Sequence, residues 1–149
     1  IDNVRRISAE LRPNVLDYLG LIPAIEWQLE ELKKRTEMDC VFSSNVTKID
    51  LGSQINSSIF RIVQEAITNI TRHSGATKVL VVIKEEKDLI KLEILDNGIG
   101  IKEDDISNAR SLGILGMKER TFQFNGKLHL ENAPKGGTLL TLIIPKSEG

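Results

Sequence analysis

The amino-acid sequence predicts an α+β domain in which a mixed, mostly antiparallel sheet carries its helices on one face. Two long segments, about residues 15–37 and 53–74, have apolar residues at helical spacing. The later strands come as two pairs close in sequence, at 78–85 with 89–95 and at 127–131 with 138–144. Because neighbouring strands can pair directly, we expect a two-layer α/β sandwich rather than a doubly wound parallel sheet.

The composition is that of an ordinary globular domain. The 149 residues, 40% hydrophobic and 28% charged, suffice for one domain with a core. A net charge of -1 gives no basic surface for nucleic acid. The single cysteine, Cys40, cannot form an internal disulfide and is expected to be a small core residue. No apolar run approaches the roughly 18 residues of a membrane span. We therefore expect a cytoplasmic domain, and the parent protein can still carry a membrane anchor elsewhere.

The first part of the chain is expected to form two helices. Residues 1–12 have helical spacing and are interpreted as the end of a helix that begins in a preceding part of a longer protein. Pro13 disfavours continuation of that helix. A second helix is predicted over about residues 15–37, with Gly20 and Pro23 weakening or breaking its first part.

A short strand is predicted next, over residues 39–46, with Val41 and Phe42 inside the domain. Ser53 is a suitable N-cap for the central helix that follows. Ser74 and Gly75 are expected to end that helix.

The central helix has a polar face of unusual composition. Glu65, Asn69 and His73 recur every four residues, so their side chains are expected to stack on one face, which Arg61 and Arg72 extend. The opposite face is apolar and consists of Ile59, Ile62, Val63, Ala66, Ile67 and Ile70. A solvated face is the ordinary explanation of such a stripe, and a functional site is the alternative.

The segment Asp96–Ile101, DNGIGI, closes the second strand of the first hairpin. Asn-Gly is a common turn signal, and a simple turn would explain it. A tight turn does not need a second glycine, Gly100, two residues after Gly98. A backbone that passes close to a flat ligand does need it. Asp96 would then offer its carboxylate to an amino group.

Two further glycine clusters follow. Gly113 and Gly116 are predicted to open a helix over about residues 115–124, where backbone N–H groups can receive phosphates. The spacing is not that of a Walker A loop. Gly137 and Thr138 open the last strand, where a β-turn is the ordinary explanation.

Taken in order, these signals form one set. The chain resembles the ATP-binding domain of histidine kinases, with the Bergerat fold shared by gyrase, Hsp90 and MutL. Within that group it is most similar to sensor kinases of the nitrate-sensor and lipid-fluidity-sensor type. The segments that carry the resemblance are ELRPNVLDYLGLIPAIEWQLEE (10–31), RIVQEAITNITRHSGA (61–76), LDNGIGI (95–101) and SLGILGMKER (111–120).

The resemblance implies roles for the central helix. Asn69 matches the asparagine that coordinates Mg²⁺, and Glu65 matches the acidic residue that orients or activates the reacting group. Arg72 and His73 match positions that contact the ATP phosphates. A Mg²⁺ ion with few protein ligands and several phosphate oxygens is a usual arrangement for this cation.

The resemblance also implies an adenine pocket and a lid. Asp96 matches the aspartate that accepts a hydrogen bond from the adenine amino group, and Thr138 matches the threonine beside it. The residues implied to line the pocket are Gly98, Gly100 and Ile101, and those of the lid near the phosphates are Gly113 and Gly116.

The implied function is phosphoryl transfer in a two-component system. The domain would bind Mg-ATP and donate the γ-phosphoryl group to a histidine in the dimerisation domain of the parent kinase, for relay to a response-regulator aspartate. Residues 1–12 would be the end of the dimerisation hairpin and residues 13–149 the catalytic domain. The only histidines, His73 and His129, do not match the acceptor, so we expect no autophosphorylation by the chain alone.

The expected partners are the dimerisation domain and the response regulator, with no nucleic acid. The parent is expected to be a homodimer and this chain a monomer or weak dimer. Alternatives are a Bergerat-fold ATPase or anti-sigma-type serine kinase, a nucleotide-binding regulatory module without transfer activity, and an α+β domain without a ligand.

Overall fold

The computed structural model describes residues 16–101 and 109–146. The elements are α2 (Leu21–Arg35), β1 (Asp39–Ser44), α3 (Ser53–Asn69), the π-helical turn η1 (Ile70–Ser74), β2 (Lys78–Glu85), β3 (Leu89–Asp96), α4 (Ala109–Phe122), β4 (Lys127–Asn132) and β5 (Thr138–Pro145). The helix expected over residues 1–12, and with it the boundary between residues 12 and 13, lies outside the described residues.

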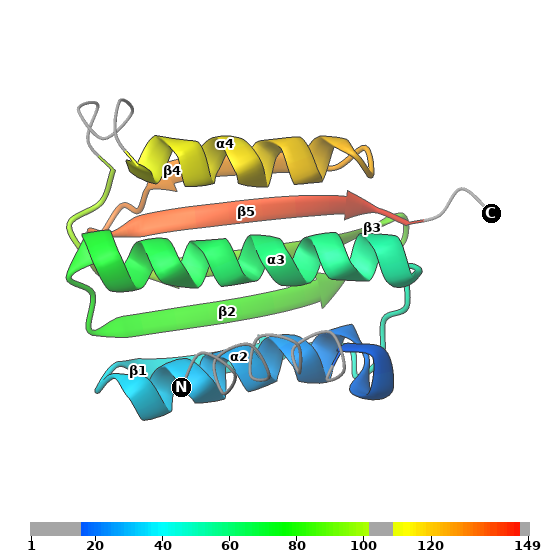
Figure 1. Cartoon of the computed structure of the whole chain (residues 1–149), viewed down its shortest axis with the longest axis horizontal. Helices are drawn as coiled ribbons and strands as arrows, with labels where there is room; N and C mark the ends of the chain where they lie inside the picture. Colours follow the sequence, from blue (N-terminus) through cyan, green and yellow to red (C-terminus); the bar gives the residue numbers. More distant parts are fainter. Residues whose placement is uncertain (1–15, 102–108, 147–149) are drawn as a thin grey trace, which may run out of the picture.

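The predicted fold class is confirmed. The five strands form one sheet in the order β1-β2-β3-β5-β4. Strand β1 pairs with β2 in parallel, and the other three pairs are antiparallel. Figure 1 shows α2, α3 and α4 side by side on one face of this sheet. The C-terminal end of α3, the end of β3 and the start of β5 therefore meet at one end of the molecule.

The core lies between α3 and the sheet. Alternate residues of β2, β3 and β5 face it, as the period of two along a strand requires. All six apolar residues predicted for the buried face of the central helix, five in α3 and Ile70 in η1, are buried. The central strands contribute Val79, Val81, Ile83, Ile90, Leu92, Ile94, Leu140, Leu142 and Ile144. This packing fixes α3 against the strands whose ends carry the candidate site.

Two expectations for the first third of the chain are corrected. Val41 is 48% exposed, because successive side chains of a strand point to opposite faces and only Phe42 packs against the core. The break expected in the first part of the helix over about residues 15–37 lies at Gly20, before α2 begins at Leu21. Pro23 does not break α2, because it lies in the first turn, where an N–H group has no intrahelical partner.

The start of α3 is held by the residues before it. Ser53 is the first helical residue, and Gly52 occupies the N-cap position without a side-chain cap, so the predicted Ser53 cap is wrong. Instead the Asp50 carboxylate accepts hydrogen bonds from the Gly52 N–H (3.0 Å) and the Asn56 side-chain amide (3.3 Å). Both bonds lower the pKa of Asp50, and the bond from the Gly52 N–H has the larger effect.

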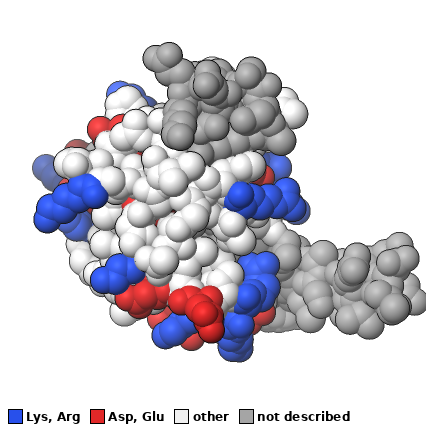
Figure 2. All heavy atoms as spheres, turned by 90° about the vertical axis from the view of Figure 1, so that its left-hand side faces the viewer, with Lys and Arg blue, Asp and Glu red and all other residues white. Residues whose placement is uncertain are grey.

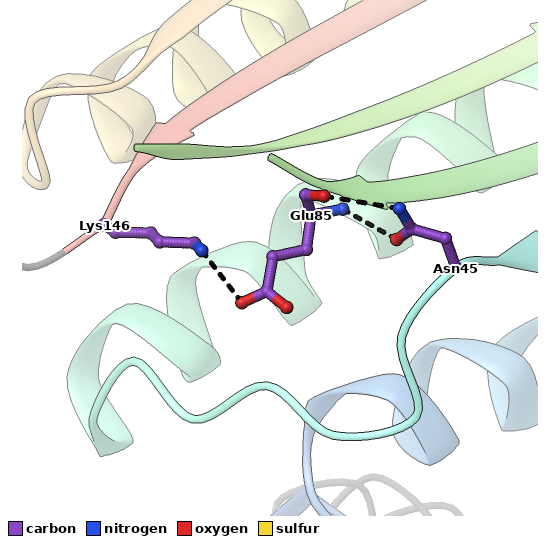
Figure 3. A network of polar contacts seen from close by, with 3 residues as sticks. All are labelled: Asn45, Glu85 and Lys146. Atoms are coloured by element: carbon purple, nitrogen blue, oxygen red, sulfur yellow. Dashed lines mark hydrogen bonds and ion pairs between the residues drawn. The ribbon is translucent and has the colours of Figure 1, made fainter. Parts of the chain in front are cut away.

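A side-chain amide also extends the sheet where β1 ends. The Oδ1 atom of Asn45 accepts the Glu85 N–H (2.8 Å), and its Nδ2 atom donates to the Glu85 carbonyl (3.3 Å). Figure 3 shows this pair of bonds, with the Glu85 carboxylate reaching Lys146 at 3.1 Å. Asn45 thereby takes the place of a strand residue opposite Glu85.

Candidate functional site

The polar face of α3 leads into the candidate site. Asn69 is 8% exposed and Glu65 is half-buried. The helix then widens into the π-helical turn η1, which contains an exposed Arg72 and a half-buried His73. Such turns occur frequently at functional sites. His73 thus follows Glu65 and Asn69 at the predicted four-residue interval, but it lies in the wider turn and not in α3.

The last residue of this turn, Ser74, holds the loop that follows β3. Its Oγ atom donates to the Ile70 carbonyl (2.6 Å) and accepts the Ala76 N–H (3.0 Å). Its carbonyl accepts the Ile99 N–H (2.9 Å). Gly98 lies directly against Ser74, and a Cβ atom there would come within 2.6 Å of the Ser74 Cβ. Gly98 therefore serves close packing against the helix end.

Asp96 is the buried acid of the site. It is 3% exposed, and its Oδ1 atom accepts the Gly98 N–H (2.8 Å) and the Thr138 N–H (3.3 Å). No residue of 16–101 or 112–146 donates to its Oδ2 atom. The Oγ1 atom of Thr138 is also buried and has no hydrogen-bond partner among the described residues. An acceptor and a hydroxyl thus remain available side by side, and a buried hydroxyl without a partner is costly.

A cavity of about 30 Å³ joins these groups. It brings together four of the predicted residues, Asn69, Asp96, Ile101 and Thr138. The rest of its lining is Ala66, Ile70, Ile94, Ile114, Met117, Leu130 and Leu140. About 30 Å³ is room for one or two water molecules, whereas ligand pockets usually measure several hundred Å³. The cavity must therefore enlarge to take a nucleotide base.

The other predicted residues lie around this cavity without lining it. Those of the α3 end are Glu65, Arg72 and His73, and the glycines are Gly98, Gly100, Gly113 and Gly116. Gly98 and Gly100 are not among the residues that line this cavity, and their place beside a bound base stays a prediction. Each of them instead packs against a neighbouring residue, Ser74 or Asn132, and so holds the loop that presents Ile101.

The helix α4 begins earlier than predicted. It starts at Ala109, so Gly113 and Gly116 lie inside the helix and do not open it. Their N–H groups are consequently engaged in the helix, and phosphate binding by them would require its first turns to unwind. Gly113 lies against the carboxylate of Glu65, so a Cβ atom there would collide with that side chain. The sequence predicts that Gly113 opens the helix, whereas in the structure Gly113 allows α4 to approach α3.

The charges at this end of the molecule lie around an uncharged centre. Figure 2 looks onto this end, with Lys and Arg side chains at several points around the uncharged area and Asp and Glu gathered below it. Cations at the margin can attract an anionic ligand.

Within residues 16–101 and 109–146, no group of three His, Cys, Asp or Glu side chains could hold a metal ion alone. Among the described helices, none is long and apolar enough to cross a membrane.

With this geometry established, comparison with known proteins identifies the family. The model of the histidine kinase-, DNA gyrase B- and HSP90-like ATPases matches residues 54–148. The chain belongs to this family. The matched region runs from the first turn of α3 to beyond β5 and therefore includes every residue around the cavity.

Sensor histidine kinases are among the relatives in this ATPase family. MctS of Rhizobium johnstonii, a sensor histidine kinase, is 36% identical over 149 residues, which are 99% of this chain and 32% of that protein. NreB of Staphylococcus carnosus, an oxygen sensor histidine kinase, is 32% identical over 145 residues, 97% of this chain and 42% of that protein. The chain thus spans less than half the length of these curated relatives.

The fold is also similar to that of a solved ATP-binding domain. The ATP binding domain of PrrB from Mycobacterium tuberculosis superimposes with a TM-score of 0.70 at 24% identity, over 83% of this chain and 92% of that one. At this identity the likeness concerns the fold alone. Together with the family match, these relatives confirm the prediction of an ATP-binding domain of the sensor histidine kinase type.

The residues of the cavity fit an adenine nucleotide. The Asp96 carboxylate can only accept hydrogen bonds when ionised, and the Thr138 hydroxyl has a free donor and free acceptor positions. Adenine offers an amino donor next to a ring acceptor, which complements these two groups. The sequence predicts a site at both residues, but it does not indicate the contacts of Ser74 and Asn132 with the loop that follows β3.

Proposed function

We propose that this domain binds Mg-ATP through the cavity and presents the γ-phosphoryl group to a histidine outside this chain. The observation that carries the proposal is the pairing of the buried Asp96 carboxylate with the unpartnered Thr138 hydroxyl in a cavity that Asn69 also lines. Asp96 would select adenine over guanine, since a carboxylate accepts from an amino group and repels the carbonyl oxygen of guanine.

The metal and the phosphates would lie beyond the base, toward the end of α3. The Asn69 side-chain oxygen is the proposed protein ligand of Mg²⁺, a cation that usually keeps water and phosphate oxygens as its other ligands. Arg72 and His73, in the turn that follows, are the proposed phosphate contacts. Bound Mg-ATP would supply the phosphoryl group, and the residues of the chain would orient it and offset its charge.

Glu65 is the proposed residue that orients the acceptor. It lies one helical turn before Asn69 on the same side of α3. The acceptor histidine is proposed to belong to the dimerisation domain of the parent kinase, and a response-regulator aspartate to receive the phosphoryl group next. The sensor kinase relatives support this assignment.

Calorimetric titration of the chain with ATP, with and without Mg²⁺, tests the proposal. Asp96→Asn should weaken binding at least tenfold, because a hydrogen bond to a charged group contributes about 1.5–3 kcal/mol. Asn69→Ala should bind ATP with little dependence on Mg²⁺. Lys135→Ala, an exposed change in the turn before β5, is the control and should bind normally.

Two results would contradict the proposal. The first is a folded wild-type chain that does not bind ATP. The second is equal affinity of wild type and Asp96→Asn, which would place the base elsewhere. Circular dichroism of each variant ensures that any lost binding is not lost folding.

A further inference from the structure

The side chain of Asn132, the last residue of β4, holds the backbone of Ile101 by two hydrogen bonds. Its Oδ1 atom accepts the Ile101 N–H (2.7 Å), and its Nδ2 atom donates to the Ile101 carbonyl (3.2 Å). A side-chain amide used in this way replaces a neighbouring strand. Ile101 thus has a fixed position although it belongs to no strand.

The contact between Asn132 and Ile101 requires glycine at position 100. Its φ angle is +84°, a conformation that glycine adopts without strain. A Cβ atom on Gly100 would lie 2.5 Å from the Asn132 Oδ1 atom, closer than real Cβ contacts allow. The second glycine of DNGIGI, which the sequence suggested was needed beside a flat ligand, is therefore needed beside Asn132.

The contact joins two walls of the cavity. Ile101 lines the cavity from the loop, and Thr138 lines it from β5. Asn132 is the residue opposite Thr138 in the β4–β5 pair. Leu130, two residues earlier on β4, lines the cavity as well. One side chain therefore fixes the Ile101 wall relative to the strand pair that carries the unpartnered hydroxyl.

We propose that Asn132 is a positioning residue for the nucleotide base. This inference rests on the proposed function, and it concerns a residue whose side chain bonds to the backbone of Ile101 and would not touch the ligand. With the amide in place, the Ile101 wall is ordered before the base arrives. Without it, the wall must be ordered on binding, and affinity falls by that cost.

The structure supplies a matched control. Asn45 makes the same pair of side-chain hydrogen bonds to the backbone of Glu85 (Figure 3). Glu85 lies six residues along β2 from Val79, the partner of Asp96, and hence about 20 Å from the cavity. Asn45→Ala and Asn132→Ala thus remove the same chemistry, one far from the cavity and one beside it.

Two measurements on the whole chain test the proposal. The first is hydrogen exchange of the assigned Ile101 amide by nuclear magnetic resonance without nucleotide. Exchange should be fast in Asn132→Ala and slow in wild type and Asn45→Ala. The second is calorimetric affinity for Mg-ATP and Mg-ADP. Asn132→Ala should weaken both about tenfold, the effect of two lost hydrogen bonds. Asn45→Ala should stay within about twofold of wild type.

A second route breaks the same contact. Gly100→Ala should also weaken binding, and its effect should be smaller in the Asn132→Ala background, because the colliding oxygen is gone while the backbone strain remains. Affinity of Asn132→Ala equal to that of Asn45→Ala would overturn the positioning role while leaving the proposed function intact. An unprotected Ile101 amide in wild type would overturn it as well. Failure of wild type to bind nucleotide would overturn the proposed function and this inference together.

Discussion

At Gly137 the chain passes so close to the carbonyl of Asp96 that no side chain fits between them. The close approach brings Thr138, the next residue, within reach of the Asp96 carboxylate. The two groups proposed to read adenine are thus positioned by a residue that would touch neither the base nor the phosphates. At the scale of single residues, the geometry of the site depends on glycines at close backbone contacts as well as on the polar side chains.

Alanine at Gly137 should destabilise the domain more than alanine at Gly136. Both glycines have left-handed φ angles, +94° and +100°. A Cβ atom on Gly136 meets open space, whereas one on Gly137 collides with the Asp96 backbone. We expect a loss of unfolding free energy of about 1–2 kcal/mol for Gly136→Ala from strain alone. Gly137→Ala should lose about 1–3 kcal/mol more from overpacking. Urea unfolding measures both, and equal losses would show that the backbone contact is not tight.

The contact between α3 and α4 is the feature that matters most at the scale of elements. Gly113 allows α4 to lie against Glu65, the residue proposed to orient the acceptor. In this arrangement the first half of α4 covers part of the polar face of α3. Access to Glu65 therefore depends on how firmly the two helices hold together.

Alanine substitutions in α4 measure this contact. Gly116 faces open space, so Gly116→Ala should stabilise the domain by about 0.5–1 kcal/mol through helix propensity alone. Gly113→Ala should gain less, or lose stability, because the new methyl group must displace the Glu65 carboxylate. In a Glu65→Ala background the two alanines should give similar gains in thermal or urea unfolding. A full gain from Gly113→Ala in the wild-type background would mean that Glu65 yields without cost.

The sequence predicts α3 well and α4 less well, for one physical reason. The buried face of α3 follows from periodicity, a property of neighbours along the chain. Gly113 and Gly116 suggest a helix start by the same local rule, yet α4 begins at Ala109 because tertiary packing on α3 outweighs the low propensity of glycine. Local patterns cannot show a contact such as Asn132 with Ile101, whose partners are 31 residues apart.

For the whole molecule, the small cavity implies that binding changes the structure. One wall of the cavity is built by the sheet and by the loop held by Ser74 and Asn132. The opposite wall includes Ile114 and Met117 of α4. Because the sheet side is tied by many hydrogen bonds, the room for a base must come mainly from movement of α4. In this arrangement only some of the predicted site residues line the cavity, as we expect for a domain that has not opened around a nucleotide.

Hydrogen exchange across the chain tests where the cavity opens. On addition of Mg-ATP, amides of α4 should change their exchange rates, whereas those of α2, on the far side of α3, should not. Mass spectrometry of proteolytic peptides has sufficient resolution for this comparison. Binding measured by calorimetry without any change in α4 would mean that the base enters by another route.

The π-helical turn that follows Asn69 and ends at Ser74 determines how the fold responds to the loss of one residue from the chain. Such a turn contains a residue more than the α-helical path it replaces. Deleting one residue there would let the helix run on regularly and would leave Ser74 pointing toward Gly98, because the wider turn accommodates one extra residue. The fold should therefore tolerate a one-residue deletion in this turn better than a one-residue deletion inside α3, which would rotate Ser74 by about 100° and move it away from Gly98. The number of residues in α3 before Ser74 thus determines the position of the loop that contains Gly98.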